Sequence, residues 1–215
     1  MPVISANFLI TADGKVSTRT LTPSGFSATT DDHRRLKKLR AGADALLVGR
    51  RTVEVDDMTM GGAVTGHYPR RMVYSPTAAL DPATRLLHTD GGPVHVICGD
   101  QVKAETADAL TTWGVAIDRF PDPTDLRHVI TQLAETYSLQ KIHCEGGPGL
   151  FKLLCEHDLI DELHLTITNR IFGGHAAPTL TGNAAQPLLP ASLQFELTHH
   201  QQIGDDVFLS YRRTR

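Results

Sequence analysis

The stretch that decides the fold is KIHCEGGPGL, residues 141–150. Its first half predicts a buried strand over 141–145, and a helix is expected over 149–157, directly after the glycines. Glycines let a backbone approach a ligand closely, and the start of a helix favours a phosphate group. The turn matches neither GxGxxG nor the P-loop pattern, so neither mechanism can be transferred to it. Two interpretations therefore stay open here, a structural β-to-α turn and a nucleotide phosphate site.

Strand-like and helix-like segments alternate on both sides of this turn. Strands are expected at residues 3–10, 45–48, 71–74, 94–98, 162–168, 194–199 and 207–211. Helices are expected at 31–40, 51–56, 101–113 and 125–137, and we interpret the basic residues of the first as a solvated face. Residues 58–69 indicate an irregular loop. The pattern predicts an α/β fold with a largely parallel sheet, helices on both faces and an antiparallel C-terminal strand pair, in one domain over 1–215.

Composition narrows the class of protein further. The chain has 215 residues, of which 40% are hydrophobic, and 21 Lys and Arg stand against 24 Asp and Glu for a net charge of −3. This composition excludes fibrous and disordered proteins. Because no global positive field exists, we expect neither nucleic acid nor a membrane as a partner, and any phosphate site must be built locally.

Cysteines and histidines give no metal signature. The three cysteines, Cys98, Cys144 and Cys155, show no CxxC spacing and lie in apolar runs, which favours buried free thiols. Eleven histidines occur without an HExxH motif, and His143 and His164 fit packing roles in strands, so no metal is expected. The N-terminal segment has no basic leader, and we expect a cytoplasmic protein.

Two further polar groups stand near expected strand ends. Thr52 and Asp56 share one face of a helix that follows a buried strand, where they could hold ribose or amide groups. From local spacing alone, a solvated helix face with some capping is the favoured interpretation. Asp13-Gly14-Lys15 ends the first strand. It fits a simple turn, or a turn in which Lys15 offers a positive charge to an anionic substrate.

Taken together, four segments resemble the reductase domain of bacterial riboflavin biosynthesis and its stand-alone relatives, which have a dihydrofolate-reductase-like fold. These segments are NFLITADGKV (7–16), the run from LRAGADALLVG to TVEVDD (39–57), EGGP (145–148) and the segment 159–174. The resemblance covers nearly the whole chain in the expected order. It implies an NADPH-dependent reductase that converts the ribosyl group of a phosphorylated ribosylaminopyrimidine to a ribityl group, by hydride transfer to C1′. The zinc deaminase that often accompanies this domain is not expected in these residues.

The resemblance also assigns site residues. Those implied to bind the cofactor are Leu9, Thr52, Asp56, Ser75, Gly146, Gly147, Pro148, Gly149 and Leu150. Those implied to face the substrate are Ser24, Phe26 and Glu145, and the candidate catalytic residues are Asp13, Lys15 and Glu145. Glu145 and Asp56 are the candidates for supplying a proton, although orienting a ligand suits both.

One segment departs from the family pattern. The family follows its Asp-Asp pair with Pro and then with Leu and Arg residues that hold the substrate, whereas here Asp56-Asp57 is followed by MTMGGA, residues 58–63. We expect Arg70 or Arg71 to replace the missing charge or to lie near the 2′-phosphate of NADPH. The alternatives are a reductase of another pyrimidine or pterin, such as dihydrofolate, and an NADP-binding protein without catalysis.

The resemblance implies a homodimer that pairs through an edge formed by late strands. Leu163, Leu165 and Ile167 in one strand, or Val207, Leu209 and Tyr211 in another, would supply the apolar edge. An internal position for these strands is the competing interpretation.

Overall fold

A computed structural model describes residues 1–17, 29–61, 66–182 and 192–215 of the chain. The strands are β1 (Val3–Thr11), β2 (Ala45–Gly49), β3 (Arg70–Tyr74), β4 (Val94–Gly99), β5 (Ala116–Phe120), β6 (Lys141–Cys144), β7 (Glu162–Thr168), β8 (Phe195–Ile203) and β9 (Asp206–Arg213). The helices are α1 (Thr30–Ala41), α2 (Arg50–Val55), α3 (Ala104–Thr111), α4 (Leu126–Tyr137) and α5 (Pro148–Glu156), with a short 3₁₀ turn at Arg85–His88.

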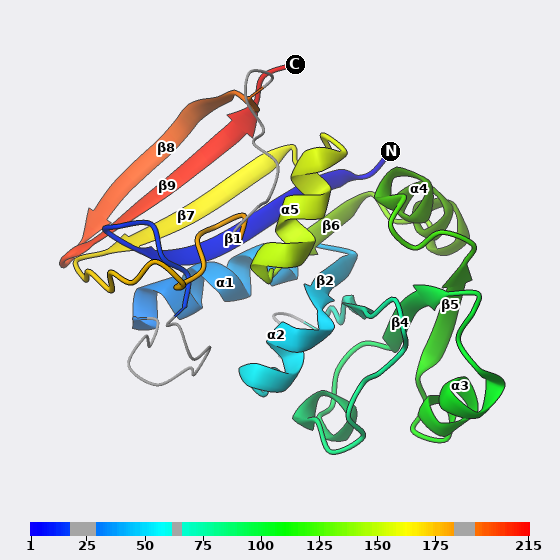
Figure 1. Ribbon diagram of the computed structural model, residues 1–215. Helices are drawn as coiled ribbons and strands as arrows, with labels where there is room; N and C mark the ends of the chain where they lie inside the picture. Colours follow the sequence, from blue (N-terminus) through cyan, green and yellow to red (C-terminus); the bar gives the residue numbers. More distant parts are fainter. Residues whose placement is uncertain (18–28, 62–65, 183–191) are drawn as a thin grey trace.

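All described strands join one sheet in the order β5-β4-β3-β2-β6-β1-β7-β9-β8. The pairs from β5 to β7 are parallel, and β9 pairs antiparallel with both β7 and β8 (Figure 1). The sequence-based prediction of a largely parallel sheet with an antiparallel C-terminal pair is therefore confirmed. In this order β6 lies between β1 and β2, so the glycine-rich turn emerges at the centre of the sheet's carboxyl edge.

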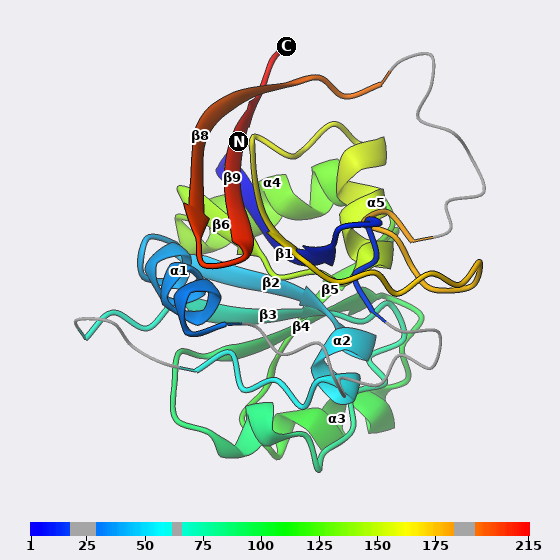
Figure 2. The ribbon, with the colours of Figure 1, turned by 90° about the vertical axis from the view of Figure 1, so that its left-hand side faces the viewer.

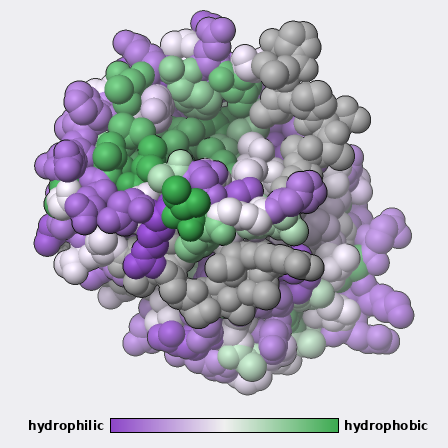
Figure 3. Space-filling view, turned by 60° about the vertical axis from the view of Figure 1, so that its left-hand side comes forward, coloured by the Kyte–Doolittle hydropathy of each residue, from purple (hydrophilic) through white to green (hydrophobic). Residues whose placement is uncertain are grey.

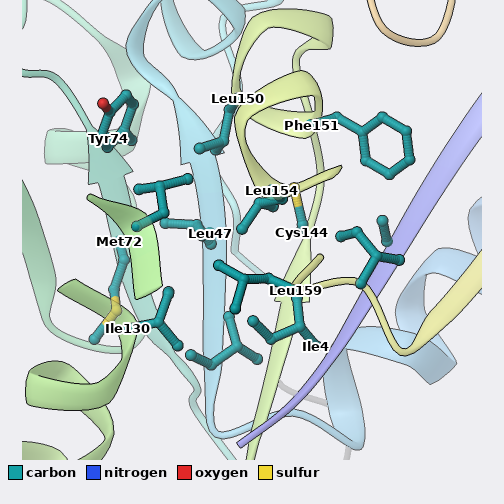
Figure 4. Close-up of a cluster of buried hydrophobic side chains, with 14 of the residues drawn as sticks. Ile4, Leu47, Met72, Tyr74, Ile130, Cys144, Leu150, Phe151, Leu154 and Leu159 are labelled. Carbon is teal, nitrogen blue, oxygen red and sulfur yellow. The ribbon is translucent and has the colours of Figure 1, made fainter. Parts of the chain in front are cut away.

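Helices cover both faces of the sheet (Figure 2). On one face, apolar residues of α4 and α5 pack on side chains from the central strands; Figure 4 shows Leu150 and Leu154 of α5 beside Leu47. On the other face, Val53 of α2 and Leu110 of α3 join a second apolar cluster. The three cysteines are buried free thiols, as expected, and burial raises the pKa of Cys144 and of Cys155 to about 12.

Helix α1 covers the face of β7 that is opposite α5. Leu165 of β7 packs on the α5 side, whereas the neighbouring Thr166 donates to the carboxyl group of Asp32 on α1. Arg35 donates to the carbonyl oxygen of Leu165 at 2.9 Å and to the hydroxyl of Ser210 at 3.2 Å. The prediction that the basic run of this helix is solvated is therefore wrong for Arg35, because its guanidinium satisfies backbone oxygens of the sheet.

The strands expected to form the dimer edge lie inside the sheet. β7 is flanked by β1 and β9, and β9 is flanked by β7 and β8, so β8 forms the edge. β8 is longer than the predicted strand at 194–199, and a bulge interrupts its pairing between Leu197 and His199. At the opposite edge, β5 was not predicted, because Asp118 and Arg119 interrupt its apolar pattern.

Candidate active site

The glycine-rich turn packs tightly between β1, β2 and α2. The amide of Gly49 donates to the carbonyl oxygen of Gly146 at 2.8 Å, and the peptide bond between Gly146 and Gly147 is cis. A Cβ atom on Gly146 would lie 3.1 Å from the ring of Phe8, and one on Gly147 would lie only 2.3 Å from Oγ1 of Thr52. No side chain fits at Gly147, so the backbone itself forms this surface.

The end of the turn starts α5 and leaves space on its outer side. Pro148 occupies the first turn of the helix, where its missing N–H costs no hydrogen bond. Gly149 is exposed, and no atom of the described residues lies within 4 Å of the position of a Cβ there, whereas Leu150 is buried in the core. The turn is therefore tightly packed at Gly146 and Gly147 and open at Gly149, where the helix starts. This arrangement suits the phosphates of a dinucleotide.

Three predicted polar residues lie along the same edge of the sheet. Thr52 faces Gly147 from the first turn of α2, and Asp56 caps that helix with its amide donating to the carbonyl of Thr52. Although Asp56 as a whole is exposed, its carboxyl group is partly desolvated by the surrounding protein, and this desolvation raises its pKa. Ser75 follows β3, is only 1% exposed, and its hydroxyl has no hydrogen-bond partner in the described part of the chain. A buried hydroxyl without a partner costs free energy unless a ligand or water satisfies it, which marks this edge as a binding surface.

Glu145 is held by an arginine that the sequence analysis did not single out. Nε and Nη2 of Arg40 donate to the two carboxylate oxygens of Glu145, each at 2.6 Å, and Nη1 donates to the carbonyl oxygen of Gly61 at 3.0 Å. The side chains are 13% and 3% exposed respectively. The bidentate pair fixes the orientation of Glu145 at the mouth of the turn and so fits the expected role in orienting a ligand.

Asp13 and Lys15 are engaged with the loop that follows β7. The carboxylate of Asp13 accepts from the hydroxyl of Thr11 at 2.6 Å and from the amides of Phe172 and Gly173 at 3.2 and 2.8 Å. The Thr11 hydroxyl, with these amides, lowers the pKa of Asp13 to about 2. Nζ of Lys15 donates to the carbonyl oxygen of Ala177 at 3.1 Å. These contacts favour a role in holding the loop beside the site.

A pocket of about 290 Å³ opens at the carboxyl ends of β1 and β7, beside the start of α1. Its lining residues are Leu9, Thr29, Asp31, Thr168, Asn169, Arg170, Ile203, Gly204, Asp205 and Asp206. The pocket thus includes Leu9, which was predicted to border the site. Next to Asp31, the carboxyl group of Asp32 is 4% exposed; burial raises its pKa, while the Thr166 hydroxyl and Arg35 act in the opposite sense. The sequence pattern at residues 29–32 indicates only the start of a helix, so the burial of Asp32 could not be predicted from it.

Arg70 and Arg71 do not reach the carboxyl edge. Both lie at the amino end of β3, and the guanidinium of Arg70 stacks 4.3 Å from the ring centroid of Tyr137. Arg71 is buried and donates to four carbonyl oxygens, those of Thr59, Leu86, Thr89 and Gly92. The expectation that one of them replaces the missing substrate charge or binds the 2′-phosphate is therefore wrong. The amino ends of parallel strands lie at the edge of the sheet opposite to the carboxyl ends, where the site is.

Two predicted substrate residues, Ser24 and Phe26, lie outside the described residues. Within the described ranges, no group of three or more His, Cys, Asp or Glu side chains is arranged to hold a metal ion. No helix in those ranges has the length and apolarity needed to cross a membrane.

The carboxyl-edge site lies on a dihydrofolate-reductase-like fold. The structure is similar to dihydrofolate reductase from Enterococcus faecalis, with a TM-score of 0.55 at 14% identity over 99% of this chain and 97% of that one. The chain belongs to the family described as the RibD C-terminal domain, whose model matches residues 2–209. The expected fold and the expected family are both confirmed.

Relatives within this family are similar over nearly the whole chain. The 2,5-diamino-6-ribosylamino-4(3H)-pyrimidinone 5′-phosphate reductase of Methanothermobacter thermautotrophicus is 27% identical over 98% of this chain and 97% of its own length. The maize riboflavin biosynthesis protein PYRR is 25% identical over 98% of this chain, which spans 33% of the plant protein. A pyrimidine reductase-like protein from Corynebacterium diphtheriae has a TM-score of 0.82 at 22% identity, covering 100% of this chain and 92% of that one. The names agree with the reductase class expected from the sequence.

Proposed function

We propose that this chain is an NADPH-dependent reductase of riboflavin biosynthesis that acts on a phosphorylated ribosylaminopyrimidine. The reaction opens the ribosyl group and reduces C1′, which leaves a ribityl chain on the pyrimidine amine. A cytoplasmic enzyme with residues 1–215 as one reductase domain is part of the same proposal. The similarity to the archaeal reductase over 97% of that protein supports the choice of substrate class.

One observation of the structure carries the proposal. The backbone at Gly147 lies so close to Thr52 that a Cβ would stand 2.3 Å from the hydroxyl oxygen, at the centre of the sheet's carboxyl edge. In open α/β sheets this edge is where nucleotides bind. The hydroxyl of Ser75, which has no hydrogen-bond partner among the described residues, lies along the same edge, so backbone, helix start and hydroxyl together fit a dinucleotide.

NADPH supplies the hydride when bound, so the protein needs no nucleophilic side chain. In this proposal the turn at 146–150 holds the pyrophosphate, and Thr52, Asp56 and Ser75 fix the remaining polar groups of the cofactor. Glu145, clamped by Arg40, and the pocket beside Leu9 hold the substrate. The protein then contributes by aligning donor and acceptor and by excluding water.

Ring opening breaks the bond between C1′ and the ring oxygen, which takes up the amine proton and leaves an imine. Addition of hydride to C1′ then requires one further proton, which the nitrogen bonded to C1′ takes up. Two carboxyl groups near this edge have raised pKa values, Asp32 beside the pocket and Asp56 beside the turn. We assign the proton to Asp32, because it is 4% exposed and lies close enough to Asp206, a lining residue of the pocket, for that carboxylate to help raise its pKa. Asp56 keeps the role of a cofactor contact.

The test is a turnover assay that follows the absorbance of the reduced nicotinamide. The purified chain is mixed with NADPH and, in parallel reactions, with the ribosylaminopyrimidine phosphate, its deaminated form or dihydrofolate. Oxidation of NADPH with a ribosylaminopyrimidine phosphate is the expected result. Turnover with dihydrofolate alone would replace the proposed substrate class, and tight NADPH binding without turnover would indicate a binding protein.

We also propose a homodimer, formed through the open side of β8 and β9. Leu197 and Val207 are 47% and 36% exposed there, and Phe195 and Tyr211 are only partly buried at the margin of the large core cluster. Antiparallel pairing places Leu197 opposite Tyr211, so these side chains share one face. Figure 3, which brings this side forward, shows hydrophobic surface gathered in a hollow. An apolar face of this kind on an edge strand is suited to a second copy.

A further inference from the structure

The interface between α1 and the strands β7 and β9 holds two buried carboxyl groups. Asp32 of α1 is 4% exposed, and Asp206, the first residue of β9, is 5% exposed. A carboxylate is rarely buried alone, because burial removes the water that stabilises its charge. The charge of these two groups therefore needs a common explanation, and the inference below rests on the proposed role of Asp32 as proton donor.

Strand register places Asp206 on the face of the sheet that α1 covers. Thr166 of β7 is the register partner of Phe208 of β9, and the Thr166 hydroxyl donates to the carboxyl group of Asp32. Asp206 lies two residues before Phe208, so its side chain points to the same face. The turn before Asp206 lies beside the start of α1, and both line the pocket (Figure 2). Burial and, as a smaller cause, the nearby Asp206 raise the pKa of Asp32.

Arg35 is the cation that faces this interface in the described part of the chain. It lies one turn after Asp32 on α1, and its guanidinium donates to the carbonyl oxygen of Leu165 at 2.9 Å and to the hydroxyl of Ser210 at 3.2 Å. The guanidinium also lies 5.5 Å from the ring centroid of Phe208. Because a guanidinium keeps its charge in proteins, Arg35 offsets the charge of one carboxylate but not of two.

Other charged groups around the pair, within the described ranges, reach solvent or are neutral. Asp31 and His33 on α1, Arg170 after β7 and Asp205 before β9 are partly or fully exposed. Water and salt screen exposed charges, so these groups act on the buried pair more weakly than groups inside the interface do. His164 lies on the same face of β7, and burial lowers its pKa to about 4, so its ring is neutral near pH 7.

We propose that Asp32 and Asp206 share one proton, that Arg35 offsets the remaining negative charge, and that Asp206 is the positioning residue that keeps Asp32 able to donate. The start of α1 also favours a single negative charge here. Once C1′ has accepted hydride, Asp32 passes the shared proton to the nitrogen bonded to C1′, and both carboxyl groups are then ionised. A proton from water restores the pair after the product leaves.

The first test needs neither cofactor nor substrate. The full chain, labelled with ¹³C at the aspartate carboxyl carbons, is titrated by NMR spectroscopy, and Asp32→Asn and Asp206→Asn identify the two signals. In the wild type, both signals should move in both of two titration steps, as coupled carboxyl groups do. The upper step should lie at least about one pH unit above the ordinary Asp value of roughly 3.9.

Three variants give effects of different sign and size. In Asp206→Asn, Asp32 should titrate in one step, at least about one pH unit below the upper step of the wild type, which is a tenfold change in its protonation ratio. Arg35→Gln should move the upper step in the opposite direction, because it removes a cation. Asp205→Asn is the matched control: it removes the same charge from the adjacent exposed residue and should move the upper step by less than about 0.3 pH unit. Circular dichroism spectra establish that each variant is folded.

The second test measures turnover as a function of pH. Asp206→Asn should lower turnover at least about fivefold near pH 8, and the difference should shrink toward about pH 5, where Asp32 regains its proton. NADPH affinity should stay within about twofold of wild type, because the pair is not assigned to the cofactor. A merely structural role of Asp206 would lower turnover by the same factor at every pH.

The outcomes separate this inference from the proposed function. Coupled titration in a protein that turns over no ribosylaminopyrimidine phosphate supports the shared proton and contradicts the proposed function. Independent titration of Asp32 and Asp206, or an Asp205→Asn effect as large as that of Asp206→Asn, overturns the inference while the reductase proposal stands. Turnover of Asp206→Asn that falls equally at all pH values overturns it as well.

Discussion

Gly147→Ala is the substitution whose effect follows most directly from the structure. The added Cβ would lie 2.3 Å from Oγ1 of Thr52, about 1.1 Å closer than the 3.4 Å at which ordinary contact begins. The φ angle of Gly147 is −78°, so the backbone conformation itself accepts alanine and the clash is the dominant effect. Overpacking of this kind costs about 1–3 kcal/mol in free energy of unfolding.

The structure also identifies the substitution that relieves the clash. Without the Thr52 hydroxyl, the nearest remaining Thr52 atom would be its Cβ at 3.7 Å, an ordinary contact. In a Thr52→Ala background, Gly147→Ala should therefore cost less than about 1 kcal/mol, which gives a coupling of about 1–2 kcal/mol in a double-mutant cycle.

Urea denaturation of the wild type, the two single variants and the double variant measures this coupling, and an NADPH titration of each folded protein measures its consequence for binding. Gly149→Ala is the matched control from the same turn, because no atom in the described part of the chain lies within 4 Å of its Cβ position. Alanine in the first turn of α5 should leave stability unchanged or raise it by about 0.5 kcal/mol. The reasoning is refuted if Gly147→Ala matches wild type, or if its cost persists when Thr52 is alanine.

Four other outcomes follow from the same structure. Arg40→Ala leaves a carboxylate that is 3% exposed without its partner and should lower the free energy of unfolding by roughly 3–5 kcal/mol in urea melts; a loss below 1 kcal/mol would show that the pair is dispensable. Burial, followed by a neighbouring histidine and nearby cations, lowers the pKa of His143 from 6.5 to about 3. The folded protein therefore resists protonation of this ring, and the free energy of unfolding falls as the pH drops below 6.5. Between pH 7 and pH 5 it should decrease by about 2 kcal/mol, and His143→Asn should remove this pH dependence. Asp56→Asn should weaken NADPH binding, whereas Asp32→Asn should lower turnover and leave NADPH affinity unchanged; identical effects of the two would contradict their separate roles. Leu197→Glu should convert a dimer to a monomer in light scattering, and a wild-type monomer at micromolar concentration would reject the dimer.

Much of the fold could be predicted because its central strands are buried on both faces. Continuous apolar runs such as Ala45–Gly49 and the alternation in Glu162–Thr168 give strong local signals. The edges were harder to predict, because an edge strand needs no such pattern. β5 carries Asp118 and Arg119, and β8 is exposed at most of its positions, so neither boundary was clear from hydrophobicity.

Site residues close together in the chain were easier to predict than pairs brought together by the fold. The glycine-rich turn and the Thr52–Asp56 face are visible in local spacing. The contact between Arg40 and Glu145 joins residues 105 positions apart, and Arg40 belongs to a basic helix that suggests solvent exposure. Arg71 shows the opposite error, because a charged residue near the end of a strand invites a ligand role, although its guanidinium serves four backbone carbonyl groups.

The most direct measurement follows one hydrogen atom. NADPH that carries deuterium at the transferable position of the nicotinamide is incubated with the protein and the ribosylaminopyrimidine phosphate, and the product is analysed by NMR spectroscopy. We predict one deuterium at C1′ of a ribityl product. A product without deuterium at C1′, or unchanged substrate after prolonged incubation with protein that binds NADPH, would contradict the proposed reaction.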